Sequence, residues 1–182
     1  PDKRKNRYIK ELNLSNYDAS VLTDEKEVSD YFDNVLIQHE DLKNSPKIVS
    51  NWITSELFSM LNKNEISIFE SPISSSNLGK LVKLILSDKI SGKIAKDVFE
   101  EMFESKKSPD EIVEEKGLIQ VTDINEIEKI IDQIFQNNKD KVSEYKKGKT
   151  KLLGFFVGQA MKVSKGKANP KILNDILLSK LS

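Results

Sequence analysis

Signals for helix starts recur along this chain, each followed by apolar residues at helical spacing. Such a signal is a side chain that accepts hydrogen bonds from the free amides of a helix's first turn. These side chains occur at Ser15, Thr23, Ser45 with Pro46, Ser108 with Pro109, Asp123, and Asn169 with Pro170. Strand signals are poor, because the best candidate, residues 118–121, is too short to build a sheet. The pattern therefore predicts an all-α fold.

The composition agrees with a helical and globular chain. Its 182 residues are 37% hydrophobic and 32% charged, with only seven Gly and five Pro. The chain has no Cys, which excludes disulfides and a Cys nucleophile and fits a reducing cytosol. No apolar run approaches the ~18 residues that span a bilayer, so we expect no membrane association. Because the first residue is Pro and not Met, we expect the sequence to be part of a longer polypeptide.

Charge is distributed unevenly although the chain is neutral overall. Residues 141–171 hold nine Lys and one acid, a net charge of +8, whereas residues 95–140 hold thirteen acids and six Lys, a net charge of −7. A basic segment attracts polyanions even within a neutral molecule. Nucleic acid is therefore the first functional hypothesis.

Charge character and helix length change between about residues 105 and 118, which predicts a domain boundary. We assign residues 1–110 to a helical domain and residues 111–182 to a second small helical domain. The second domain should hold helices at 123–137, at about 139–163 with a break near Gly148 as an alternative, and at 170–181. Gly154 and Gly158 lie four residues apart and are expected to let a neighbouring helix approach closely.

Groups for catalysis are scarce. His39 is the only His and lies at a predicted helix end, where a structural role is favoured. Acid pairs such as Glu100 with Glu104 are typical of solvated helix faces. Residues 91–96 and 166–170 each place a Gly before a Lys near a helix. Free backbone amides and an ammonium could meet one phosphate at such a point. Neither segment has the spacing of a nucleotide-binding loop. We predict no catalytic residue, no metal site and no cofactor in this chain.

Four motifs together resemble a known family. They are YDASVLT at 17–23, SGKIAKDVFEEM at 91–102, DEIVEEKGL at 110–118 and GFFVGQAMKVSKGKANP at 154–170. In this order they resemble the C-terminal part of GatB, the B subunit family of the glutamyl-tRNA(Gln)/aspartyl-tRNA(Asn) amidotransferases, and the last motif is shared with small YqeY-like proteins. The resemblance implies a helical domain followed by a YqeY-like tail domain.

The resemblance also implies a function. Such subunits activate the carboxylate of a mischarged Glu-tRNA or Asp-tRNA with ATP and magnesium, in an N-terminal cradle domain that this chain lacks, beside partner A and C subunits. The tail would hold tRNA without catalysis. The resemblance implies that seven residues bind tRNA: Lys149, Lys151, Gln159, Lys162, Lys165, Lys167 and Asn169.

Two rival functions are kept open. A protein-interaction module would dock its acidic and Lys-rich segments on partner subunits without touching tRNA, and a standalone amide-forming ligase would need catalytic residues that we do not find. The resemblance implies a cytoplasmic protein of bacterial type, with an organellar homologue as an alternative. It leaves open whether the substrate is Glu-tRNA(Gln), Asp-tRNA(Asn) or both.

Overall fold

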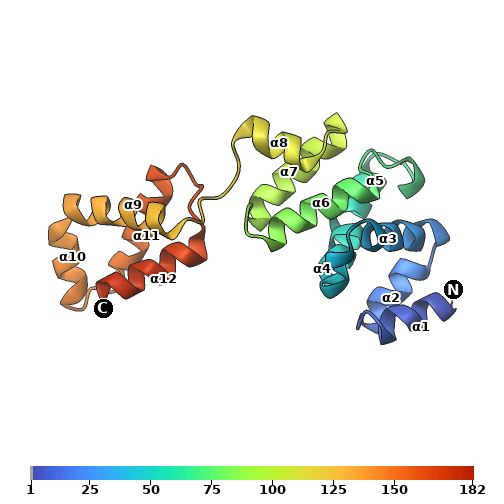
Figure 1. Ribbon diagram of the computed structural model, residues 1–182, viewed down its shortest axis with the longest axis horizontal. Helices are drawn as coiled ribbons and strands as arrows, with labels where there is room; N and C mark the ends of the chain where they lie inside the picture. Colours follow the sequence, from blue (N-terminus) through green and yellow to red (C-terminus); the bar gives the residue numbers. More distant parts are fainter. Residues whose placement is uncertain (1) are drawn as a thin grey trace. The chain divides into compact units, whose positions relative to one another are not determined.

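The computed structural model describes residues 2–182, and helices dominate this part of the chain (Figure 1). No strand forms within these residues, where the only bridge of β type pairs Val121 with Ala168. The predicted all-α fold is therefore confirmed. The chain divides into two compact units: unit 1 comprises the residues up to Ser87 together with Gly92–Gly117, and unit 2 comprises Asp88–Ser91 together with Leu118–Ser182.

The described residues of unit 1 form eight α-helices and three short helical turns. They are α1 (Asp2–Lys10), α2 (Asn16–Thr23), α3 (Lys26–Gln38), η1 (Glu40–Asn44), α4 (Pro46–Asn51), η2 (Trp52–Leu57), α5 (Phe58–Lys63), η3 (Ile68–Glu70), α6 (Ser75–Leu86), α7 (Gly92–Ser105) and α8 (Pro109–Lys116). The turn η2 is π-helical and continues α4 directly into α5.

The core of unit 1 forms where α3 and α6 pack side by side. Phe32 of α3 and Leu78 and Leu81 of α6 are fully buried there. A second part of the core joins η2 to α7, because the rings of Trp52 and Phe99 lie 5.5 Å apart between their centroids. Burial of such large apolar side chains is the main favourable contribution to the stability of a helical unit.

His39 has the structural role that the sequence favours. It ends α3, and its Nε2 lies 2.9 Å from the carbonyl oxygen of Ser76 in α6. The imidazole packs directly against Gly79, where an added Cβ would overlap the ring. Glycine at position 79 is therefore what allows α3 and α6 to approach closely at this point.

Most of the predicted helix starts are confirmed. The side chains of Ser15 and Ser108 accept hydrogen bonds from first-turn amides of α2 and α8, and α8 ends at Gly117 in the left-handed conformation, as its sequence indicates. The prediction for Thr23 is wrong. Its hydroxyl donates to the carbonyl oxygen of Ala19 at 2.6 Å, so Thr23 ends α2, and α3 begins after Glu25 without a side-chain cap.

The helix α8 belongs with unit 1. It packs against α6 and α7 through the buried side chains of Ile112 and Val113. The compact units therefore divide after Gly117, whereas the boundary predicted between residues 110 and 111 falls inside α8.

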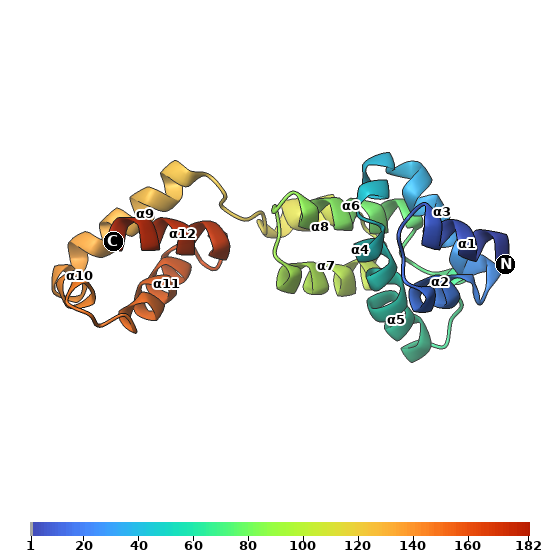
Figure 2. The same ribbon diagram turned by 90° about the horizontal axis from the view of Figure 1, so that it is seen from below.

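Unit 2 contains α9 (Ile124–Asn137), α10 (Lys139–Lys146), α11 (Leu152–Val163) and α12 (Pro170–Leu181), and Figure 2 shows these helices around a common centre. The alternative of a break near Gly148 is confirmed, because Gly148 has a φ of 116° between α10 and α11. The buried side chains of this unit come from α9, α11, the following turn and α12, and they are Ile127, Ile131, Ile134, Phe156, Ala160, Ala168, Leu173, Leu177 and Leu181.

Candidate nucleic-acid interface

One side of α11 in unit 2 carries lysine and glycine. Lys151, Gly154, Gly158 and Lys162 follow each other at intervals of three or four residues, which places them on one side of a helix, and all four are exposed. The opposite side carries Phe156 and Ala160, which are fully buried in the core of unit 2. We call these four exposed residues the α11 face. It combines two ammonium groups with two glycines, which have no side chains.

The two glycines do not have the neighbour that the sequence predicts. A Cβ added at Gly154 or at Gly158 would meet no atom within 4 Å, apart from its own helix backbone and chain neighbours. The expectation that another helix packs there is therefore wrong, because α11 buries its other side. The bare backbone instead faces open space between Lys151 and Lys162.

The remaining lysines of the predicted site differ in their surroundings. Lys165 follows α11 directly and is exposed, in a turn where its own φ is 56°. Lys149 is exposed as well, but its Nζ lies 3.6 Å from Glu144 Oε2. Gln159 is half-buried beside the α11 face. The structure therefore places Lys151 at the start of α11 and Lys162 in its last turn, on the same side of the helix, with Lys165 just beyond its end.

Asn169 serves as a helix cap. Its side chain is 7% exposed, its Oδ1 accepts a hydrogen bond from the amide of Ile172 at 3.1 Å, and its Nδ2 donates to Gln120 Oε1 at 3.1 Å. Lys167 is half-buried, and its carbonyl oxygen accepts a hydrogen bond from the amide of Val121. The predicted cap at Asn169 is confirmed, and the polar atoms of this side chain are already used within the fold.

The turn between α11 and α12 offers no free amide to a phosphate. Every amide of residues 164–169 donates a hydrogen bond inside the chain, one of them to the hydroxyl oxygen of Ser164. The possibility that free amides and an ammonium meet a phosphate here is therefore not supported, and the helix cap at Asn169 explains this turn. Any contact with an anion at this turn would come from lysine side chains.

Sequence reasoning missed Lys141 as a member of this region. Its Nζ lies 3.6 Å from the centroid of the Phe155 ring, and Phe155 is next to Gly154 in α11. A lysine over an aromatic face is held by a cation–π interaction. No sequence spacing links positions 141 and 155, because the break between α10 and α11 sets their geometry.

The strongly shifted titrating groups lie in unit 1 and have structural explanations. Burial raises the pKa of Tyr31, whose hydroxyl donates to the carbonyl oxygen of Ile73 at 2.8 Å. Burial also raises the pKa of Tyr8, whose hydroxyl lies 2.9 Å from Asp33 Oδ1. Both hydroxyls are satisfied inside the fold, so neither is poised for acid–base chemistry.

Two further features bear on possible functions of residues 2–182. No group of three or more His, Asp or Glu side chains in this part of the chain is arranged to hold a metal ion. None of the helices formed by these residues is both long and apolar enough to cross a bilayer.

Comparison with known proteins agrees with the motifs. A family model described as the GatB domain matches residues 30–181. Subunits B of aspartyl/glutamyl-tRNA(Asn/Gln) amidotransferase align with the whole chain: 50% of residues are identical in Rickettsia rickettsii (strain Sheila Smith) and 48% in Wolbachia pipientis wMel. The chain spans 37% of the length of each of these relatives. The chain therefore belongs to the GatB domain family and corresponds to the C-terminal region of these B subunits.

Proposed function

We propose that this chain is the part of a tRNA-dependent amidotransferase B subunit that binds a mischarged Glu-tRNA(Gln) or Asp-tRNA(Asn) and positions it for amidation elsewhere in the subunit. The observation that carries the proposal is the α11 face, where two exposed lysines flank two exposed glycines that face open space. A phosphate–sugar backbone can approach such a surface closely and be held by charge and shape, without reading of bases.

The lack of ion pairs at this face supports the proposal. The ion pairs formed by residues 118–182 are Lys149 with Glu144 and Lys180 with Asp132. Lys151, Lys162 and Lys165 form none, so no salt bridge must break before they meet phosphate. Release of the counterions around the RNA then drives binding.

The chemistry of the reaction is proposed to lie outside these 182 residues. ATP and magnesium would need carboxylate or phosphate-binding groups, and residues 2–182 do not bring together a metal-binding cluster. They therefore do not fit the magnesium ion, and the activation step is proposed to lie in the remainder of the subunit. The A and C subunits would contact the remainder of the subunit, and the complex would work in the bacterial cytoplasm.

A second candidate function is docking on a partner protein through unit 1. The side chain of Phe69 in η3 is 87% exposed, which is unusual for a large aromatic side chain. If unit 1 docks on a partner subunit in this way, the chain would position the complex without direct contact to tRNA.

Binding of an unmodified tRNA transcript to this chain, measured by filter retention between about 50 and 300 mM salt, separates the two candidates. Phosphate binding by three lysines predicts that the logarithm of affinity falls against the logarithm of salt concentration with a slope of about −2 to −3. Absence of retention at the lowest salt, with helicity intact, would refute the proposal and favour docking on a partner protein.

A further inference from the structure

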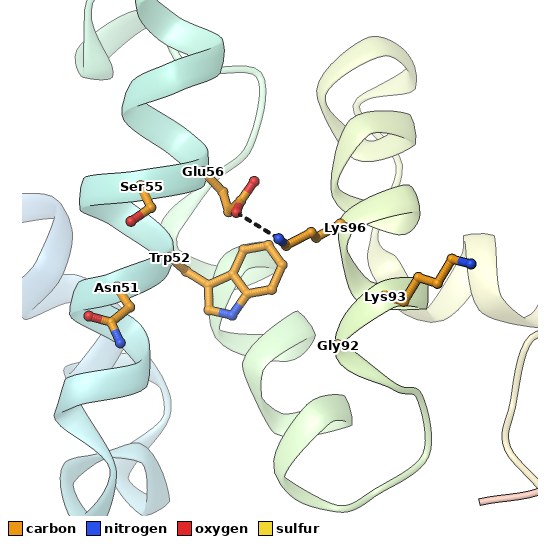
Figure 3. A pocket seen from close by; sticks show the side chains of 7 residues that line it. All are labelled: Asn51, Trp52, Ser55, Glu56, Gly92, Lys93 and Lys96. Atoms are coloured by element: carbon orange, nitrogen blue, oxygen red, sulfur yellow. Dashed lines mark ion pairs between the residues drawn. The ribbon is translucent and has the colours of Figure 1, made fainter. Parts of the chain in front are cut away.

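A pocket lies within unit 1, between η2 and the start of α7 (Figure 3). One wall carries Asn51, Trp52, Ser55 and Glu56, and the other carries Gly92, Lys93 and Lys96. Its volume is about 540 Å³, which is within the range of pockets that hold small molecules. The motif at 91–102 supplies the α7 wall, and the function proposed for unit 2 makes no use of it.

The floor of the pocket is aromatic. Trp52 is 8% exposed and its ring contacts that of Phe99, and Figure 3 shows its indole lying between the two walls. A flat indole of this kind stacks with planar ligands, and every nucleobase has a planar face. The floor therefore favours a planar aromatic group over an aliphatic one.

The rim of the pocket carries an ion pair. Lys96 reaches across it, and its Nζ lies 3.7 Å from Glu56 Oε1 (Figure 3). The side chains of Lys96 and Glu56 are 64% and 35% exposed, so solvent weakens their ion pair. Lys93 also lines the pocket, but Figure 3 shows its ammonium directed away from Trp52. The positive end of the α7 dipole lies at Gly92. An anion could therefore take the place of Glu56 beside Lys96.

A planar group next to an anion is the chemistry of a nucleotide. We propose that this pocket accepts one unpaired nucleotide of a bound RNA, with its base against Trp52 and its phosphate beside Lys96. The inference rests on the proposed RNA binding, and it adds a contact in unit 1 that is separate from the α11 face.

Trp52 supplies the measurement, because it is the only Trp in the chain. Stacking of a base on the indole should quench its fluorescence. We expect single-stranded hexa-adenylate to quench Trp52 of the 182-residue chain in a saturable titration at low salt. Hexaglutamate, which carries charge without bases, should leave the fluorescence unchanged.

Two variants and two controls assign the effect to the pocket. Lys96→Gln should weaken the affinity for hexa-adenylate about tenfold, since it removes a charged hydrogen-bond donor to phosphate. Glu56→Gln should tighten it about threefold, since it removes the competing carboxylate. Lys83 and Asp41 form an ion pair of similar length, 3.6 Å, elsewhere in unit 1. Lys83→Gln and Asp41→Asn should therefore leave the affinity unchanged.

Each alternative outcome has a definite meaning. Absence of quenching by hexa-adenylate, or quenching that neither Lys96→Gln nor Glu56→Gln alters, would overturn the inference. Quenching by adenosine monophosphate but not by hexa-adenylate would overturn the assignment to RNA. Quenching by hexaglutamate would indicate an acidic peptide instead. If tRNA is retained on filters while Trp52 stays unquenched, the inference fails and the proposed function stands. Quenching by hexa-adenylate in a chain that does not retain tRNA would refute the proposed function and support the pocket.

Discussion

The two units use lysine differently. Lysine forms nine ion pairs within residues 2–182, and seven of them lie in unit 1, where for example Lys47 pairs with the buried Asp18. Lys151 and Lys162 of the α11 face in unit 2 have no such partner. Lysines in ion pairs contribute to local packing and neutralise nearby acids. Lysines without a carboxylate partner remain available to bind a polyanion.

Glycine shows the same difference. Gly79 of unit 1 is buried against His39, so its missing side chain makes room for packing within the fold. Gly154 and Gly158 of unit 2 face open space, and the fold does not need that room. Unit 1 therefore uses small and charged residues in contacts within the fold, whereas unit 2 presents them on its surface.

The first prediction concerns whether the two units unfold independently, and it involves the largest change in the free energy of unfolding. Phe156→Ala should destabilise unit 2 by about 3–5 kcal/mol, because this fully buried ring contacts Phe135 and Phe155. Thermal unfolding followed by circular dichroism should then show an early transition, while the fluorescence of Trp52 in unit 1 keeps its midpoint. Phe32→Ala should instead shift the Trp52 transition. If the circular dichroism and Trp52 fluorescence midpoints both shift in Phe156→Ala, the two units do not unfold independently.

The next effect sharpens the contrast between the glycines. Gly79→Ala should destabilise unit 1 by about 1–3 kcal/mol, because the added Cβ overlaps the His39 ring and displaces its contact with the carbonyl oxygen of Ser76. Urea unfolding followed by Trp52 fluorescence measures this change. An unchanged midpoint would show that α3 and α6 do not need the close approach.

The same substitution should have the opposite sign in unit 2. Gly154→Ala and Gly158→Ala should each stabilise unit 2 by about 0.5–1 kcal/mol, because alanine favours a helix and its Cβ meets no neighbour. Circular dichroism during urea unfolding measures this gain. Gly158→Leu should weaken tRNA binding while leaving the fold intact, since it covers the bare backbone, and undiminished binding would argue against close approach at this point.

The smallest expected effect concerns acid stability of unit 1. Hydrogen bonds from Lys26 and Arg4 hold the pKa of the Asp30 carboxyl below its usual range. A lowered pKa stabilises the fold above the usual Asp value of about 4, and this contribution is lost as pH falls through the lowered value. Asp30→Asn should therefore flatten the loss of unit 1 stability at acid pH, as followed by Trp52 fluorescence, whereas Asp132→Asn in unit 2 should not.

Local signals predicted much of the fold because they act within one helical turn. Ser108 and Asn169 cap their helices as the sequence indicates, since a cap needs only the residues that follow it. Thr23 was misassigned because its hydroxyl can bond backward to Ala19 as well as forward, and sequence does not distinguish these choices.

The candidate site was less predictable because it depends on which side of a helix is buried. The sequence locates the lysines of α11, but the assignment of Gly154 and Gly158 to a helix contact required knowledge of the buried side. The approach of Lys141 to Phe155 and the pocket between η2 and α7 join segments far apart in sequence. Only the packed structure brings these groups together.

The central claim is that the unpaired lysines of unit 2 bind tRNA, and charge reversal in each unit tests it most directly. The triple variant Lys151→Glu, Lys162→Glu and Lys165→Glu is compared with a matched triple variant of exposed lysines in unit 1, Lys3→Glu, Lys10→Glu and Lys63→Glu. Filter binding of a tRNA transcript at fixed salt should show a loss of about 100-fold or more for the first variant and less than about threefold for the second. Equal losses in the two variants, with helicity retained in both, would contradict the account.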